Sequence, residues 1–126
     1  MMDWFRAYAV FGVATSFFLA DIANGEAAGA MAIGKCAAYG YSYDYAKEPD
    51  ARMQALRKCT GGKCKVVATM RRGCAAFAID GKNACGAHGY AVAQQLGQAQ
   101  NVALRYCYKY GGRDCVIRAF ACDAKG

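Results

Sequence analysis

Eight cysteines constrain this chain more than any other feature of its 126 residues. None falls in the apolar segment at the start, and all follow residue 35: Cys36, Cys59, Cys64, Cys74, Cys85, Cys107, Cys115 and Cys122. An even number of cysteines behind an apolar leader is typical of small exported proteins held by disulfides. We therefore expect a secreted or periplasmic protein with four disulfide bonds.

The first 30 residues have the layout of a secretory signal peptide. A polar start with Arg6 precedes the uncharged run 7–20, which is shorter than the roughly 20 residues that span a bilayer. Ala28-Gly29-Ala30 then gives a small-x-small cleavage motif. We expect cleavage after Ala30, which leaves no membrane anchor and one domain over 31–126. An uncleaved anchor or a buried core helix is the alternative.

The expected mature chain is basic, since it keeps 15 of the 16 Lys and Arg residues but only 6 of the 9 Asp and Glu residues. Its formal charge, 15 minus 6, is +9. Such a charge favours anionic partners, among them lipid head groups, envelope polymers and acidic proteins. The alternative is that the charge serves only to keep a small exported protein in solution.

The cysteines form two sets of four at corresponding places along the chain. The segment ALRKC at 55–59 recurs as ALRYC at 103–107, an offset of 48 residues. Three further cysteine pairs follow at offsets of 49, 51 and 48 residues: Cys36 and Cys85, Cys64 and Cys115, Cys74 and Cys122. We interpret 36–80 and 85–122 as two copies of one unit, related by an approximate twofold axis.

Each copy has the pattern strand, helix, strand. The predicted strands are 36–45, 64–70, 74–79, 85–93 and 115–121, and the predicted helices are 49–59 and 97–107. Arg71-Arg72-Gly73 is expected to be the turn of a hairpin. The predicted class is α+β: two pseudo-symmetric strand–helix–strand halves share one antiparallel sheet core, stapled by disulfides, with about five strands.

Several motifs together identify a family that this chain resembles. They are the run YGYSYDY at 39–45, a helix ending in Ala-Leu-x-x-Cys, GGKCKVV at 61–67, RGCAA at 72–76 and a closing Ala-Cys at 121–122. Their order resembles the bacterial exported family called domain of unknown function 4189, over roughly 33–123. The resemblance implies a small exported α+β domain, alone or joined to other exported domains, without agreed catalytic residues. Cys36 and Cys85 look like additions to the usual cysteines of that family.

Eight cysteines allow 105 pairings, and the repeat helps to choose among them. A local link could join each helix end to the next strand, and residues near a twofold axis lie close to their own copies. We therefore expect Cys59–Cys64 and Cys107–Cys115 within the halves, and Cys36–Cys85 and Cys74–Cys122 across the twofold. The local links should contribute about 2 kcal/mol each and the long ones about 4 kcal/mol. Zinc is the competing use, but an exported context favours oxidation, so we expect no metal.

Patterns for catalysis are weak. His88 is the only histidine, and a serine triad would need it to converge with Ser42 and Asp44. A glycosidase would need two carboxylates, yet Glu48 and Asp50 suit the start of a helix. Glycine patterns of phosphate-binding loops are absent from the sequence. We therefore expect a non-enzymatic protein without a cofactor.

Two groups of side chains could bind a partner. Tyr39, Tyr41, Tyr43 and Tyr45 alternate along one strand, so all four rings should leave one face, as core or as a platform for sugar rings or apolar ligands. The second group could form an anion-binding edge or only a solvated turn: Lys63, Lys65, Arg71 and Arg72. Tyrosines and cations together could also hold single-stranded nucleic acid. An exported protein meets nucleic acid less often than envelope polymers, so no nucleic acid is expected.

The sequence thus predicts an exported, non-enzymatic binding or interaction module, acting in the periplasm or outside the cell. Its partner is expected to be a protein or an anionic component of the envelope. Two alternatives remain open. One is a small secreted hydrolase or inhibitor that uses His88 and Asp44, and the other is a secreted effector that acts on a host or rival cell.

Overall fold

The computed structural model describes residues 27–123, which form two three-stranded antiparallel sheets with one helix each. The first sheet has the strand order β2 (Tyr39–Tyr45), β1 (Ala28–Ile33), β3 (Lys65–Arg71), and its helix is α1 (Glu48–Lys58). The second has the order β5 (Asn83–Ala93), β4 (Cys74–Asp80), β6 (Cys115–Cys122), and its helix is α2 (Leu96–Lys109). Each half is therefore a ββαβ unit with its first strand at the sheet centre.

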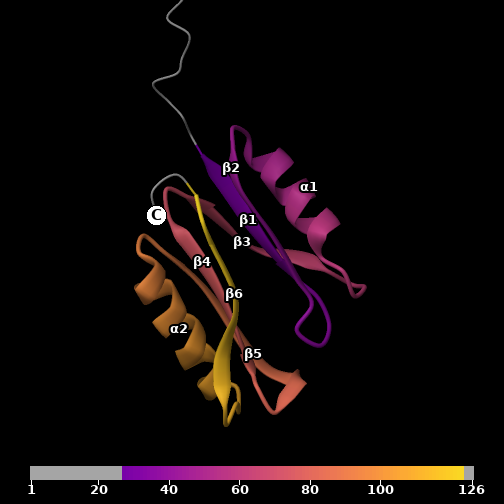
Figure 1. Cartoon of the computed structure of the whole chain (residues 1–126), viewed down its shortest axis with the longest axis vertical. Helices are drawn as coiled ribbons and strands as arrows, with labels where there is room; N and C mark the ends of the chain where they lie inside the picture. Colours follow the sequence, from indigo (N-terminus) through magenta and orange to yellow (C-terminus); the bar gives the residue numbers. More distant parts are fainter. Residues whose placement is uncertain (1–26, 124–126) are drawn as a thin grey trace, which may run out of the picture.

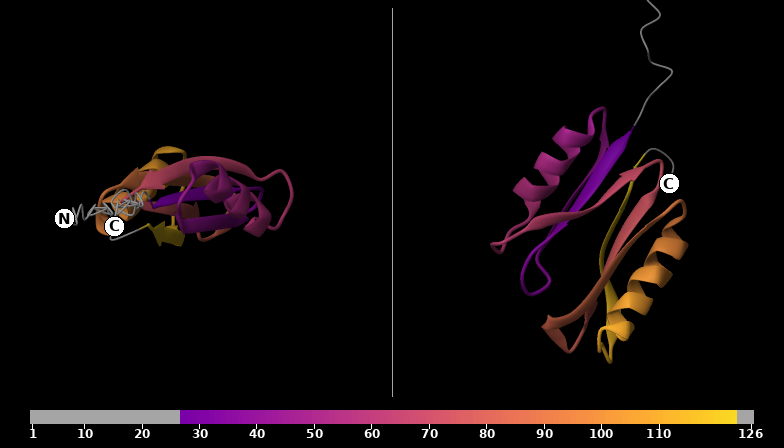
Figure 2. Two further views of the ribbon diagram at one scale, coloured as in Figure 1. Left: turned by 90° about the horizontal axis from the view of Figure 1, so that it is seen from above. Right: turned by 180° about the vertical axis from the view of Figure 1, so that it is seen from behind.

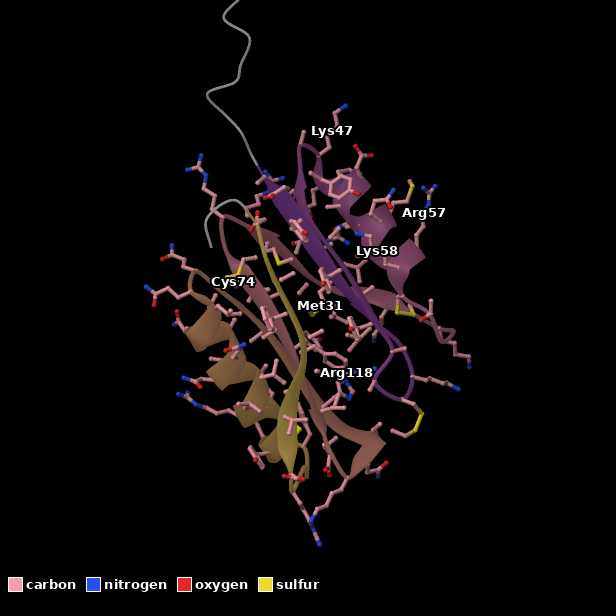
Figure 3. The ribbon with its side chains drawn as sticks, in the orientation of Figure 1. Met31, Lys47, Arg57, Lys58, Cys74 and Arg118 are labelled. Carbon is pink, nitrogen blue, oxygen red and sulfur yellow. A yellow bond between two sulfur atoms is a disulfide. The ribbon has the colours of Figure 1, made fainter. Side chains whose placement is uncertain are left out.

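The two sheets face each other, and the helices cover their outer faces (Figure 1). The rear view in Figure 2 shows the same four layers. Between the sheets lies an apolar core to which both halves contribute, with Met31 and Met70 from the first sheet and Phe77 and Ile79 from the second. Figure 3 shows Met31 in this inter-sheet region. The α+β class and the shared core are confirmed, although the core lies between two sheets.

Small residues bring each helix close to its sheet. Alanines of β1 pack against Ala51 and Ala55 of α1, and alanines of β4 pack in the same way against Ala99 and Ala103 of α2. At the closest approach the neighbouring strand carries a glycine, Gly40 in β2 or Gly89 in β5. A Cβ atom at either position would collide with the backbone of the helix above it, so each site requires glycine.

The strand β1 is the element that the sequence analysis missed, and it raises the number of strands from five to six. It begins at Ala28, three residues before the expected start of the domain at Met31. The motif Ala28-Gly29-Ala30 misled the prediction because small residues suit both a cleavage site and a strand packed under a helix. Residues 1–26 lie outside the described part, so the signal peptide stays a prediction. Cleavage of a signal peptide would leave β1 intact only if it occurred before Ala28.

The expected hairpin at Arg71-Arg72-Gly73 is wrong, because β3 and β4 belong to different sheets. β3 pairs with β1, whereas β4 pairs with β5 and β6, and the actual hairpin joins β4 to β5. A fully buried acid holds the crossing between the sheets. The carboxylate of Asp123 accepts hydrogen bonds from the backbone N–H groups of Arg72 and Gly73, each at 2.8 Å.

The four disulfides join the same pairs that the sequence analysis expected. Two of them tie a helix end to the following strand, and Cys36–Cys85 links the two halves. The reasoning for Cys74–Cys122 was wrong, because these two residues are register partners on neighbouring strands of one sheet. Hence a single disulfide crosses between the halves within residues 27–123.

Removing Ala28–Ala30 tests the position of the domain boundary. These residues pair with both neighbours of β1, so a chain that starts at Met31 leaves backbone groups of β2 and β3 unpaired. We expect the chain from Met31 to be less stable than the chain from Ala27 by about 2–4 kcal/mol. Thermal unfolding of both oxidised chains, followed by circular dichroism, measures the difference. Equal unfolding midpoints would show that Ala28–Ala30 add no stability, and would support a domain that starts at Met31.

Candidate functional site

The tyrosine row of β2 is only partly an exposed platform. Tyr39 and Tyr41 stack in parallel, with ring centroids 6.2 Å apart, and both pack against the inter-sheet core. Tyr43 continues the stack and is half exposed. Tyr45 does not belong to the row, since it packs against the cluster under α1 on the opposite face. An irregularity in the β1–β2 register, with Asp44 at a φ of 60°, reverses the alternation before Tyr45.

The four basic residues expected to form one edge do not lie together. Lys65 begins β3 and Arg71 ends it, which separates them by about 20 Å at the usual rise of a strand. Lys63 precedes β3, and Arg72 follows it in the crossing between the sheets. The strand therefore divides the expected anion-binding edge into two separate basic regions.

Arg71 is engaged by an acidic side chain. Its Nη2 atom lies 3.2 Å from Oε2 of Glu48, and Nε of Arg52 lies 3.2 Å from the other carboxylate oxygen. The hydrogen bond from Arg71, followed by that from Arg52, lowers the pKa of Glu48. Glu48 thus neutralises part of the charge at this end of β3, which makes Arg71 a poorer ligand for an external anion.

The other end of the molecule holds five cations around two adjoining hollows. We call this group the cationic cleft: Lys35, Lys58, Lys63, Lys65 and Arg118. One hollow of about 340 Å³ is lined by Lys35, Lys63 and Lys65, and the other, of about 660 Å³, by Lys35, Lys58 and Arg118. No carboxylate of residues 27–123 lines either hollow. The cleft therefore has an unbalanced positive charge.

Arg118 connects the two halves at this cleft. It reaches from β6 to the loop between β1 and β2, where its Nε donates a hydrogen bond of 3.3 Å to the carbonyl oxygen of Ala37 (Figure 3). Its guanidinium also lies 5.1 Å from the ring centroid of Tyr39. These contacts hold the guanidinium group in place, while the side chain remains exposed at the rim of the larger hollow.

Sequence reasoning identified Lys63 and Lys65 but missed the other three members of the cleft. Lys35 was overlooked although it adjoins Cys36, which the repeat placed near the twofold axis. Lys58 and Arg118 come from the end of α1 and from the opposite sheet, and no local spacing joins them. The fold of the first half brings the four lysines to one surface, and the packing of the two sheets adds Arg118.

The candidate catalytic residues are not brought together. Ser42 is fully buried, and its hydroxyl donates a hydrogen bond of 2.6 Å to the carbonyl oxygen of Ala51. His88 lies on β5 of the other sheet, where its ring meets the edge of Phe77 at a centroid distance of 6.1 Å. Asp44 lies at the irregularity of β2. Serine and histidine thus occupy different sheets, and a triad is not assembled.

Residues 27–123 contain no cluster of three or more His, Cys, Asp or Glu side chains that could hold a metal ion. All eight cysteines are in disulfides. Within the same range, neither helix is long and apolar enough to cross a membrane. Four disulfides in one small domain are typical of proteins that fold in an oxidising compartment.

A comparison with models of protein families shows which family this chain belongs to. The model of the family "Domain of unknown function (DUF4189)" matches residues 28–122, which run from the first residue of β1 to the last of β6. The chain belongs to this family. The DUF4189 match begins at Ala28, as the sheet does, and so includes the central strand. Searches of curated proteins and of solved structures gave no match.

The ion pairs of Glu48 can be tested by titration. Replacing Arg71 with alanine removes the larger cause of the lowered pKa, so we expect the pKa of Glu48 to rise toward its ordinary value. NMR titration of the Glu48 carboxyl carbon measures it. Arg57→Ala, which removes a cation from the last turn of the same helix, should leave this pKa unchanged. An unchanged pKa in Arg71→Ala would show that Arg71 is not held by Glu48 in solution.

Proposed function

We propose that this DUF4189 domain is an exported, non-enzymatic binding module whose cationic cleft holds an anionic component of the cell envelope. The observation that carries the proposal is the charge of the cleft. Five cations surround two hollows that no carboxylate of the described residues lines. Clustered charges of one sign at a concave surface raise the local concentration of ligands of the opposite sign.

The positions of the acidic side chains support this proposal. Glu48 is paired with two arginines, Asp80 accepts hydrogen bonds from the backbone N–H groups of Lys82 and Arg113, and Asp123 is buried at the crossing. These acids have structural partners, and none of them lines either hollow of the cleft. The positive potential at the cleft is therefore not balanced by neighbouring carboxylates.

Disulfides hold the loops that present these cations. Cys36–Cys85 fixes the loop that carries Lys35, and Cys59–Cys64 fixes the turn between Lys58 and Lys63. Because these loops are already ordered, ligand binding loses less conformational entropy, and this favours affinity. The same disulfides support an oxidising compartment, where the available anions include envelope polymers and lipid head groups.

The test compares two double variants with equal change of charge. Lys63→Glu with Lys65→Glu alters the cleft, whereas Lys47→Glu with Arg105→Glu alters exposed cations outside it. Lys47 lies at the start of α1, at the other end of the helix from Lys58 (Figure 3). The oxidised domain should bind immobilised polyphosphate at low salt, and the cleft variant should bind at least about tenfold more weakly.

The control variant should keep most of the wild-type affinity. Equal weakening of both double variants would mean that net charge alone drives binding, and the cleft would lose its role. Absence of binding by the wild-type domain at low salt would also overturn the proposal. The four substituted positions are exposed, so both variants should fold as the wild type does. Thermal unfolding of all three proteins checks this.

A further inference from the structure

A second groove lies in the other half, at the place equivalent to the larger hollow of the cationic cleft. We call it the tyrosine groove: Tyr90, Tyr106 and Tyr110, with Gly86 and Gly89 between them and His88 at one side. Its volume is about 730 Å³. Both grooves lie between the end of a helix and an edge strand, which is β2 in the first half and β5 in the second. Lys58 precedes Cys59 in one, as Tyr106 precedes Cys107 in the other.

The three tyrosines are available to a ligand. Tyr90 is 39% exposed, Tyr106 is 40% exposed and Tyr110 is 65% exposed. The rings of Tyr106 and Tyr110 stack with centroids 6.2 Å apart and planes 15° from parallel, so they form one flat aromatic wall. Gly86 and Gly89 line the groove beside this wall with their backbones alone, because α2 and Asn83 fill the places where their side chains would lie.

The tyrosine groove adjoins the cationic cleft. Gly86 and His88 line both the groove and the smaller hollow of the cleft, while Lys35 and Cys36 line both hollows of the cleft. The three depressions therefore follow one another past the Cys36–Cys85 disulfide. Three tyrosines line one end of this series, and cations line the other end together with Tyr39.

We infer that the tyrosine groove is a sugar subsite, and that the ligand is a glycan with a phosphate or carboxylate near one end and neutral rings beyond it. This inference rests on the proposed function of the cationic cleft. Tyrosines suit sugars because their faces pack against the apolar side of a pyranose ring, while their hydroxyls can exchange hydrogen bonds with its hydroxyls. The cations would hold the acidic end.

Single-stranded nucleic acid fits the arrangement less well. Every nucleotide carries both a base and a phosphate, so its binding surfaces interleave aromatic rings with cations along the strand. Here the three tyrosines of the groove and the five cations of the cleft line different hollows, with ring–cation contacts at Tyr39–Arg118 and Tyr106–Lys109. An oxidising compartment also favours glycans as the available polymer.

The experiment uses four probes on the oxidised domain: a maltooligosaccharide with a terminal phosphate, the same oligosaccharide without phosphate, polyphosphate, and oligothymidylate. Calorimetry compares the wild type with Tyr106→Ala/Tyr110→Ala and with Tyr108→Ala. Tyr108 is the matched control, because it is 51% exposed on the same helix and does not line the groove.

We expect the phosphorylated oligosaccharide to bind the wild type more tightly than either the neutral oligosaccharide or oligothymidylate. The double tyrosine variant should bind it about tenfold more weakly, with its affinity for polyphosphate unchanged. Tyr108→Ala should match the wild type. Tyr106→Phe/Tyr110→Phe keeps the stacked rings, so it should retain most of the affinity, while unchanged binding of polyphosphate shows that the double alanine variant is folded.

Three outcomes would overturn the sugar subsite while leaving the cationic cleft intact. These are unchanged affinity of the double alanine variant for the phosphorylated oligosaccharide, an equal loss toward polyphosphate, and tighter binding of oligothymidylate than of the oligosaccharide. If the Lys63→Glu/Lys65→Glu variant binds polyphosphate as the wild type does, the proposed function itself fails. The two failures are therefore distinguishable.

Discussion

The packing of two central strands, each buried on both faces, is the constraint on which the rest of the structure depends. β1 and β4 alternate small and large side chains, with alanines toward a helix and Met31, Ile33, Phe77 and Ile79 toward the opposite sheet. The alanine face lets a helix approach closely, and the larger face fills the space between the sheets. Four layers follow from this alternation.

The layered packing also creates the candidate binding surface. Each sheet contributes loops at the same end of the molecule, where Cys36–Cys85 holds the two halves together. Cations from the end of α1, from the loop between β1 and β2, from the start of β3 and the turn before it, and from β6 meet there. The equivalent place in the other half carries tyrosines. One topology thus supplies two related grooves with different chemistry.

The sequence was sufficient for the class, the helices and the two local disulfides, because cysteine spacing and helical periodicity are local signals. The repeat led to the two long pairs as well, although Cys74–Cys122 lies within one sheet and does not cross the twofold axis. It was insufficient for the arrangement of strands. Alternation does not distinguish a strand that pairs with the next one from a strand that crosses to another sheet, so the segment Arg71-Arg72-Gly73 was taken for a hairpin turn. β1 was missed because Ala28-Gly29-Ala30 has the small residues of a cleavage motif. Tyr45 was misplaced because an irregular register leaves no signal in the residue pattern.

The candidate site was predictable only in part, for the same reason. Lys63 and Lys65 lie close in the sequence, whereas Arg118 reaches the cleft from the opposite sheet through its contacts with Ala37 and Tyr39. The assignment of Arg71 to a binding edge ignored Glu48, which is 23 residues away in the chain but 3.2 Å away in space. Contacts of this kind depend on sheet order.

Native-state hydrogen exchange of the oxidised domain tests the central claim most directly, since it reports the free energy at which each backbone amide opens. If β1 and β4 are the central strands of one shared core, the amides of Ala30–Ala32 and Ala76–Ala78 should be the slowest to exchange. Their opening free energies should also agree within about 0.5 kcal/mol, because both strands would open only with the whole domain. Amides of β1 that open well before those of β4 would contradict this account.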